Sequence, residues 1–257
     1  MKRFCFTVDD NIRFLRDLTR SNYNSLFDHP YLAMYRRLHE NYNIKIQLNL
    51  FYEMHGFNLS LATDRYRNEW QKNADWLRLS FHSKRENVRP YEAASYDEVF
   101  ADCEAVHREI LRFAGSASLA RTTTIHYCRA TKEGVRALRD CGVIGLLGLY
   151  GSEEAPRSSY DVSKADGDRI RAGEVLLGNG MAHGSIDLIL NRHTKEEVLC
   201  LLDKLTDRPL VKLMIHEQYF YEDYPRYQPD FEEKLSAAFS LLRKQGFVGT
   251  FFEACLS

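Results

Sequence analysis

The sequence lacks the features that would place it in a membrane or direct it out of the cell. None of its apolar runs reaches the roughly 18–20 residues that a membrane-spanning helix requires. Its first residues lead directly into two aspartates, without the apolar core and small-residue cleavage site of a signal peptide. We therefore expect a cytoplasmic protein that does not bind a membrane.

The sequence also has little net charge, which limits the partners that it can attract. Its 35 lysines and arginines nearly balance its 36 aspartates and glutamates, so the formal net charge is −1. No strong overall field therefore favours nucleic acid. The short basic stretches at 36–37 and 169–171 are typical of solvated helix faces or loops. Nucleic acid is accordingly not expected as a partner.

Paired cysteine motifs are absent as well. None of the six cysteines forms a CxxC pair, and all but Cys103 lie in apolar or strand-like contexts. This pattern indicates scattered, reduced core thiols and argues against a zinc–thiolate site or a disulfide framework. The six residues are Cys5, Cys103, Cys128, Cys141, Cys200 and Cys255.

No glycine-rich phosphate loop follows the first apolar run, and no internal repeat is present. The chain instead alternates short apolar runs with amphipathic helical patterns. About seven β-then-α units predict one α/β domain, 1–257, in which a parallel sheet closes into a distorted TIM-like (β/α)7 barrel. An open doubly wound sheet is the alternative. The polar stretch 150–173 is predicted to be an irregular excursion from the domain.

The boundaries of these elements follow from periodicity and from capping residues. Thr194 and Glu197, for example, form the capping box of a helix that begins at Lys195. The predicted helices cover 11–19, 31–41, 64–73, 96–113, 132–140, 195–205 and 230–245. The predicted strands cover 2–8, 44–52, 76–81, 121–127, 143–149, 174–178, 185–190, 210–215 and 247–252.

Several predicted strands end in side chains that bind metals or transfer protons. These residues are Asp9, Asp10, His82, His126 and His216. The carboxyl ends of the strands in a parallel barrel meet on one face, where active sites are built. Each residue also has a structural interpretation. Asp10 could be the N-cap of the first helix, and each histidine could be a hydrogen-bonded core residue.

Further candidates surround these strand ends. Glu217, Tyr219 and Tyr221 follow His216, and such side chains suit a polar pocket with aromatic walls, as in sugar-binding sites. His55 follows the second strand and falls on the same predicted face, where it could contact a substrate. Of these, Glu217, Tyr219 and His55 are taken as candidate substrate-binding residues.

Three segments resemble the motifs of the polysaccharide deacetylases, the NodB-like carbohydrate esterases. Thr7-Val8-Asp9-Asp10-Asn11 is similar to their first motif, T-F-D-D-G. His82-Ser83-Lys84-Arg85-Glu86 is similar to the second, H-[ST]-x-x-H, and Leu213 to His216 is similar to the late strand that ends in a catalytic histidine. The order and spacing match across most of the chain. The resemblance implies the same distorted (β/α)7 barrel.

The resemblance also implies roles for these residues. Asp9 would be the general base, and His216 would be the general acid. Asp10 and His82 would hold a divalent metal ion, with zinc expected first and nickel, cobalt or manganese as alternatives. Glu86 stands where the second motif has its other histidine, so the third ligand is either Glu86 or His126, and we prefer His126.

The third motif of the family, an arginine followed by prolines, has no match in this sequence. Arg129 lies in the corresponding region and is predicted to serve as the orienting cation, so we count it among the substrate-binding residues.

These observations favour a metal-dependent hydrolase that removes an acyl group, expected to be N- or O-acetyl, from a saccharide or a related substrate. The expected partner is a small molecule or an oligosaccharide. A glycosidase-like or amidohydrolase variant with Asp9, Asp10 and Glu217 as its carboxylates is one alternative. A carbohydrate-binding barrel that has lost its metal is the other.

Overall fold

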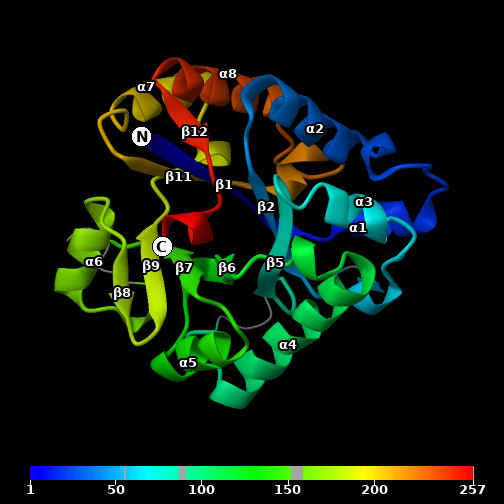
Figure 1. Ribbon diagram of the computed structural model, residues 1–257, viewed down its shortest axis with the longest axis horizontal. Coiled ribbons are helices and arrows are strands. Elements are labelled where there is room, and N and C mark those ends of the chain that lie inside the picture. Colours follow the sequence, from blue (N-terminus) through cyan, green and yellow to red (C-terminus); the bar gives the residue numbers. More distant parts are fainter. Residues whose placement is uncertain (55, 87–90, 152–158, 257) are drawn as a thin grey trace.

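The fold is known from a computed structural model, which describes residues 1–54, 56–86, 91–151 and 159–256. Strands occupy the centre of the molecule and helices surround them (Figure 1). The strands are β1 (Lys2–Asn11), β2 (Ile46–Phe51), β3 (Glu53–Met54), β4 (Phe57–Asn58), β5 (Leu77–Ser83), β6 (Thr122–Thr123), β7 (Gly145–Gly148), β8 (Leu176–Gly178), β9 (Met181–Ser185), β10 (Leu188–Ile189), β11 (Leu210–His216) and β12 (Phe247–Gly249).

The helices carry the amphipathic patterns that the sequence predicts. They are α1 (Arg13–Arg20), α2 (Pro30–Tyr42), α3 (Arg67–Lys72), α4 (Tyr96–Phe113), α5 (Lys132–Asp140), α6 (Lys164–Arg171), α7 (Lys195–Asp203) and α8 (Phe231–Lys244). Capping boxes start α4 at Ser95 and α7 at Thr194. In each box the hydroxyl of the cap residue accepts a hydrogen bond from the backbone N–H of the glutamate three residues later, and the side chain of that glutamate accepts one from the backbone N–H of the cap residue. In the part of the chain that is described, no helix has the length and apolarity to cross a membrane.

The strands form two arcs of mainly parallel sheet. The first has the order β10-β11-β1-β2-β5, with β12 also paired to β1. The second has the order β6-β7-β9-β8, in which only the β8–β9 pair is antiparallel. β1 lies at the centre of the first arc and is buried along most of its length on both faces, as expected for a parallel strand covered by helices.

Backbone hydrogen bonds join the two arcs into a distorted barrel. At one junction, Ala120 N–H donates to the carbonyl oxygen of Leu79 at 2.8 Å. At the other, Asp187 N–H donates to the carbonyl oxygen of Lys212 at 2.8 Å. The Asp187 carboxylate also lies 3.1 Å from the buried Lys212 ammonium group. The structure thus has the predicted α/β barrel, and solved structures of the same fold, described below, agree with this assignment.

Several predicted elements differ from the observed ones. The predicted strand 121–127 is reduced to β6, because the chain leaves the sheet after Thr123 and His126 lies in a short 3-10 turn with positive φ angles at Tyr127 and Cys128. The stretch 150–173, predicted to be irregular, contains α6. Of the cysteines predicted to be core thiols, Cys200 is exposed.

Candidate metal centre

A bulge at the end of β1 brings two consecutive carboxylates to one site. Val8 pairs with Leu48 and Asn11 pairs with Leu50, so Asp9 and Asp10 together lie opposite the single residue Asn49. Such a bulge redirects side chains that would otherwise point to opposite faces of the sheet. Asp10 has φ of 62°, a left-handed conformation that aspartate tolerates better than most residues and that recurs at functional sites.

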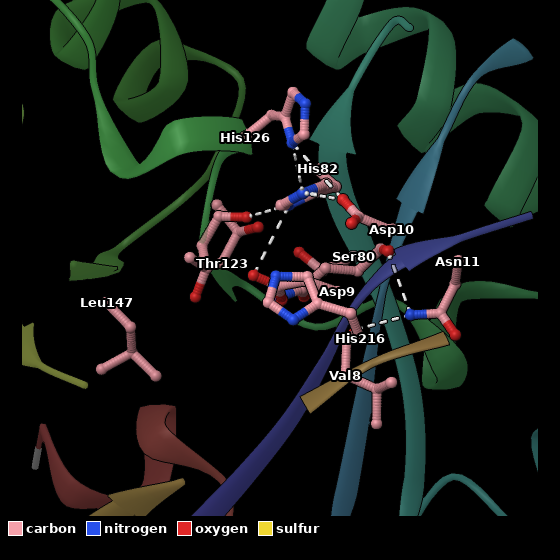
Figure 2. A network of polar contacts seen from close by, with 12 residues as sticks. Val8, Asp9, Asp10, Asn11, Ser80, His82, Thr123, His126, Leu147 and His216 are labelled. Carbon is pink, nitrogen blue, oxygen red and sulfur yellow. Dashed lines mark hydrogen bonds and ion pairs between the residues drawn. The ribbon is translucent and has the colours of Figure 1, made fainter. Parts of the chain in front are cut away.

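Three side chains converge at this bulge and form a donor cluster, which we define as Asp10, His82 and His126. His82 Nε2 lies 3.0 Å from Asp10 Oδ1, His126 Nδ1 lies 3.4 Å from the same oxygen, and the two ring nitrogens are 3.2 Å apart. Figure 2 shows the three side chains pointing toward one another, with Asp9 and His216 beside them. Tetrahedral coordination with metal–nitrogen bonds of about 2.0–2.1 Å spaces its ligand atoms about 3.3 Å apart.

The hydrogen bonds around the donor cluster orient lone pairs toward its centre. His82 Nδ1 lies 2.5 Å from the carbonyl oxygen of Thr124, so this nitrogen carries a proton, and Nε2, which faces Asp10, is the nitrogen available to a metal ion. His126 Nε2 is buried and has no hydrogen-bond partner among the residues that the structure describes, whereas its Nδ1 faces the cluster. A ligand histidine with its other nitrogen held by a backbone carbonyl is the usual second layer of a metal site. The residues therefore fit a divalent cation.

The electrostatics of the donor cluster also favour a cation. Burial raises the pKa of Asp10, but hydrogen bonds from His126 and His82 outweigh this effect and hold the pKa well below its usual value. Burial lowers the pKa of His82, and the carboxylates of Asp9 and Asp10 more than reverse this effect, so its pKa lies above the ordinary value. Asp10 is thus ionised at neutral pH, and positive charge beside it is stabilised.

Gln218 holds the second carboxylate oxygen of Asp10. Its Nε2 donates to Asp10 Oδ2 at 2.7 Å, which leaves Oδ1 directed at the two histidines. Gln218 was not predicted as a site residue from the sequence. Its position two residues after His216, at the end of β11, was the available signal, because that end of the strand lies on the same face of the barrel.

The alternative role of Asp10 as a helix cap is filled by another residue. Glu217 Oε2 accepts hydrogen bonds from Ile12 N–H at 2.7 Å and Arg13 N–H at 2.9 Å, and its Oε1 accepts one from Phe14 N–H at 2.8 Å. The Tyr221 hydroxyl donates to Oε1 at 3.1 Å. Glu217 thus caps α1 through its buried side chain, and its predicted place in a substrate pocket is not where the structure puts it.

Replacing Glu217 with glutamine is expected to lower the free energy of unfolding by about 2–4 kcal/mol, because one acceptor oxygen becomes an NH2 group that faces backbone donors. Urea denaturation of the metal-free protein measures this loss. Glu222→Gln makes the same chemical change at an exposed residue. It is the matched control and should leave the urea midpoint of unfolding unchanged. An unchanged midpoint for Glu217→Gln would contradict the capping role.

Asp9 and His216 lie at matching positions at the ends of adjacent strands. Their Cα atoms are register partners in the β1–β11 pair. Asp9 is 1% exposed and accepts a hydrogen bond from Asn49 Nδ2 at 2.7 Å. Burial raises the pKa of Asp9 although His82 and His216 oppose this, which moves the carboxyl toward the range suited to a general base.

His216 is oriented by a neutral side chain. Its Nδ1 lies 2.8 Å from Asn191 Oδ1, an acceptor, so Nδ1 carries a proton and Nε2 is the nitrogen left for chemistry. Burial lowers the pKa of His216 despite the nearby carboxylates of Asp10 and Asp9. Neither Asn191 nor Asn49 was found from the sequence. The polar residues inside the apolar strand that contains Asn49 were a signal for it.

The remaining predicted residues are dispersed. The Tyr219 ring lies 6.2 Å from the His216 ring, within reach of the same site. Arg129, predicted to be the orienting cation, forms an ion pair with Glu92. Glu86 lines a cavity of about 470 Å³ together with Arg85, and it is not part of the donor cluster. His55 lies outside the described residues.

Known proteins resemble this chain in fold but not in sequence. No protein-family model matches the chain, and no curated protein matches it by sequence. A family 4 acetyl xylan esterase from Clostridium thermocellum, solved in complex with a cobalt ion, has a TM-score of 0.56 at 12% identity, over 98% of this chain and 89% of that chain. A CE4 family pseudoenzyme from Bacillus anthracis has a TM-score of 0.55 at 12% identity, over 100% of this chain and 66% of that one.

A third solved structure extends the comparison beyond the esterases. A 4-α-glucanotransferase from Thermococcus litoralis has a TM-score of 0.60 at 15% identity. All of this chain is covered, but it spans only 40% of the glucanotransferase. At such identities the likeness concerns the fold. The chain therefore has the distorted, mainly parallel α/β barrel fold of the CE4 polysaccharide deacetylases, at low sequence identity.

Proposed function

We propose that this chain is a metal-dependent hydrolase that removes an acetyl or related acyl group from a saccharide. The observation that carries the proposal is the donor cluster, in which atoms of Asp10, His82 and His126 approach one another to 3.0–3.4 Å beside the buried Asp9 carboxylate. The cobalt-bound acetyl xylan esterase with a similar fold supports this assignment.

Asp10, His82 and His126 would hold the metal ion, with zinc as the first expectation. When bound, such an ion polarises an acyl carbonyl and lowers the pKa of a coordinated water toward neutrality. Gln218 keeps Asp10 Oδ1 turned to the two histidines. Because His82 Nδ1–H is engaged by the Thr124 carbonyl, its ring is fixed in the tautomer that a metal ligand requires.

Asp9 and His216 would move the protons of the reaction. Asp9 Oδ1 is occupied by the Asn49 donor, so Oδ2 is the atom that would accept the proton of the attacking water. His216, when protonated on both ring nitrogens with its Nδ1–H held by Asn191, would pass the proton of Nε2 to the leaving oxygen or nitrogen. Tyr219, beside His216, is the remaining candidate for contact with the sugar.

The non-catalytic alternative remains a candidate because a CE4 family pseudoenzyme has a similar fold. The glycosidase-like alternative is less well supported, because it assigns Glu217 a role in the pocket whereas that carboxylate caps α1.

Zinc-loaded protein is expected to release acetate from p-nitrophenyl acetate or from an N-acetylated glucosamine oligosaccharide. Removal of the ion with a chelator should abolish this release, and added zinc or cobalt should restore it. Acetate release and metal content, measured on the same samples, test the proposal. Stoichiometric metal without release of acetate from either compound would favour the non-catalytic alternative, and failure to bind any divalent ion would contradict the proposed centre.

A further inference from the structure

A chain of hydrogen bonds inside the barrel leads from β6 to Asp9. The Thr122 hydroxyl donates to Gln47 Oε1 at 2.9 Å, Gln47 Nε2 donates to Asn49 Oδ1 at 2.8 Å, and Asn49 Nδ2 donates to Asp9 Oδ1 at 2.7 Å. Gln47 Nε2 also donates to the Thr122 carbonyl oxygen at 2.8 Å, which closes a ring between the two residues. We call Thr122, Gln47 and Asn49 the amide relay.

The direction of every bond in the amide relay follows from its last member. An ionised carboxylate only accepts, so Asn49 must turn its NH2 group toward Asp9 and its oxygen toward Gln47. Gln47 must then present its NH2 group to Asn49 and its oxygen to the Thr122 hydroxyl. Each amide has one orientation only, and a rotation of either side chain would set two acceptors or two donors against each other.

The amide relay is sealed from solvent. Asn49 is 0% exposed, Thr122 is 1% exposed and Gln47 is 3% exposed. In a site of low dielectric constant a satisfied network is rigid, because each broken bond leaves a buried polar group without a partner. Gln47 precedes Asn49 on β2 and Thr122 lies on β6, so the relay runs through the barrel interior toward the amino-terminal part of β2.

Within the described residues, no other side chain takes the place of Asn49 at Asp9. His82 Nδ1 is 4.0 Å from Asp9 Oδ2, and its proton is already donated to the Thr124 carbonyl. Arg129, the cation that the sequence suggested, is engaged by Glu92. Asp9 is therefore held by a neutral amide at one oxygen, which leaves its other oxygen for the site.

We propose that Asn49, locked by Gln47 and Thr122, is the positioning residue for Asp9 and replaces an orienting cation. The inference rests on the proposed function. The fixed NH2 group determines the rotation of the Asp9 carboxylate, so that Oδ1 stays in the relay and Oδ2 faces the attacking water. A neutral donor provides this orientation without forming an ion pair that would compete with proton uptake by Asp9.

The test compares turnover of p-nitrophenyl acetate by zinc-loaded wild type, by Asn49→Leu, which keeps the volume and removes the amide, and by Asn49→Asp, which replaces the NH2 donor with an oxygen and adds a carboxyl group beside Asp9. We expect kcat to fall about 10–100-fold in both variants, the usual effect of losing an outer partner of a site residue. KM and zinc content should be unchanged. Gln47→Leu should show a smaller fall in kcat, because Asn49 remains but its amide is no longer locked.

A double-mutant cycle separates positioning from a structural effect. In an Asp9→Asn background, Asn49→Leu should cost no further activity, since the group that it positions has lost its function. Asn73→Leu is the matched control, because Asn73 is half-buried and bridges Glu69 and Trp76 far from the site. It should lower stability without changing kcat.

The outcomes distinguish this inference from the function on which it depends. If the wild type is active and both Asn49 variants keep its kcat, the positioning role is overturned while the hydrolase assignment stands. An equal loss in both backgrounds of the cycle also overturns the positioning role. If zinc-loaded wild type releases no acetate, the proposed function fails and the inference fails with it.

Discussion

Asp10→Ala and His82→Ala should each abolish stoichiometric zinc binding while leaving the fold largely intact. Asp10 Oδ1 and His82 Nε2 are the closest pair of the donor cluster, at 3.0 Å, so either change removes a ligand and leaves two donors. Loss of an outer partner already weakens metal affinity about 10–100-fold, and loss of a ligand should exceed this range. Competition with a chromogenic chelator measures the affinity, and circular dichroism reports the fold.

The choice of third ligand can be decided by the same measurement. His126→Ala should weaken zinc binding, because His126 Nδ1 lies 3.2 Å from His82 Nε2. Glu86→Ala is the matched control and should retain wild-type affinity, since Glu86 lies outside the donor cluster. Full metal occupancy in either Asp10→Ala or His82→Ala would show that the ion binds elsewhere, and loss of affinity only in Glu86→Ala would reverse the assignment.

Asp9→Asn should retain zinc and lose turnover by about 10²–10⁴-fold, the range that a positioned general base contributes. The substitution is nearly isosteric, and the new amide oxygen can still accept the hydrogen bond from Asn49 Nδ2. Metal binding should therefore persist while proton abstraction from water is lost. Single-turnover assays of acetate release, together with metal analysis of the same preparation, provide the measurement.

A second variant and the metal content of Asp9→Asn test the assignment of Asp9 as the general base. His216→Asn should also lower kcat, with zinc retained, because it removes the other proton-transferring group. Undiminished activity in Asp9→Asn would remove the general-base role from Asp9. Loss of the metal in Asp9→Asn would instead assign this carboxylate to the coordination sphere, and the roles of Asp9 and Asp10 would have to be exchanged.

Local patterns predicted much of the secondary structure because the physics that forms these elements is local. The predicted bounds of α4 and α5 are the observed ones, since capping residues and helical periodicity lie within the segments themselves. The predicted strand at 121–127 was wrong beyond Thr123, because β propensity does not decide where a chain leaves its sheet.

The site shows the same division between local and long-range information. Asp10, His82 and His126 were predicted from their positions at strand ends, and the structure brings them together. The prediction for Glu217 failed because its hydrogen bonds reach residues about 200 positions away, such as Ile12 at a separation of 205. Asn49, Asn191 and Gln218 escaped notice because nothing nearby in the sequence shows which side chains they meet.

The amino-acid sequence by itself determined the alternation of strands and helices, and with it the face of the barrel on which acidic and histidine side chains gather. It did so because periodicity and capping act over a few residues. Only the tertiary structure decided that a bulge directs the side chains of both Asp9 and Asp10 toward one site. It also decided that the donor cluster contains His126 and not Glu86, and that the side-chain amide of Asn49 donates to Asp9. These outcomes depend on strand register and on hydrogen bonds between distant segments, which exist only once the barrel has closed.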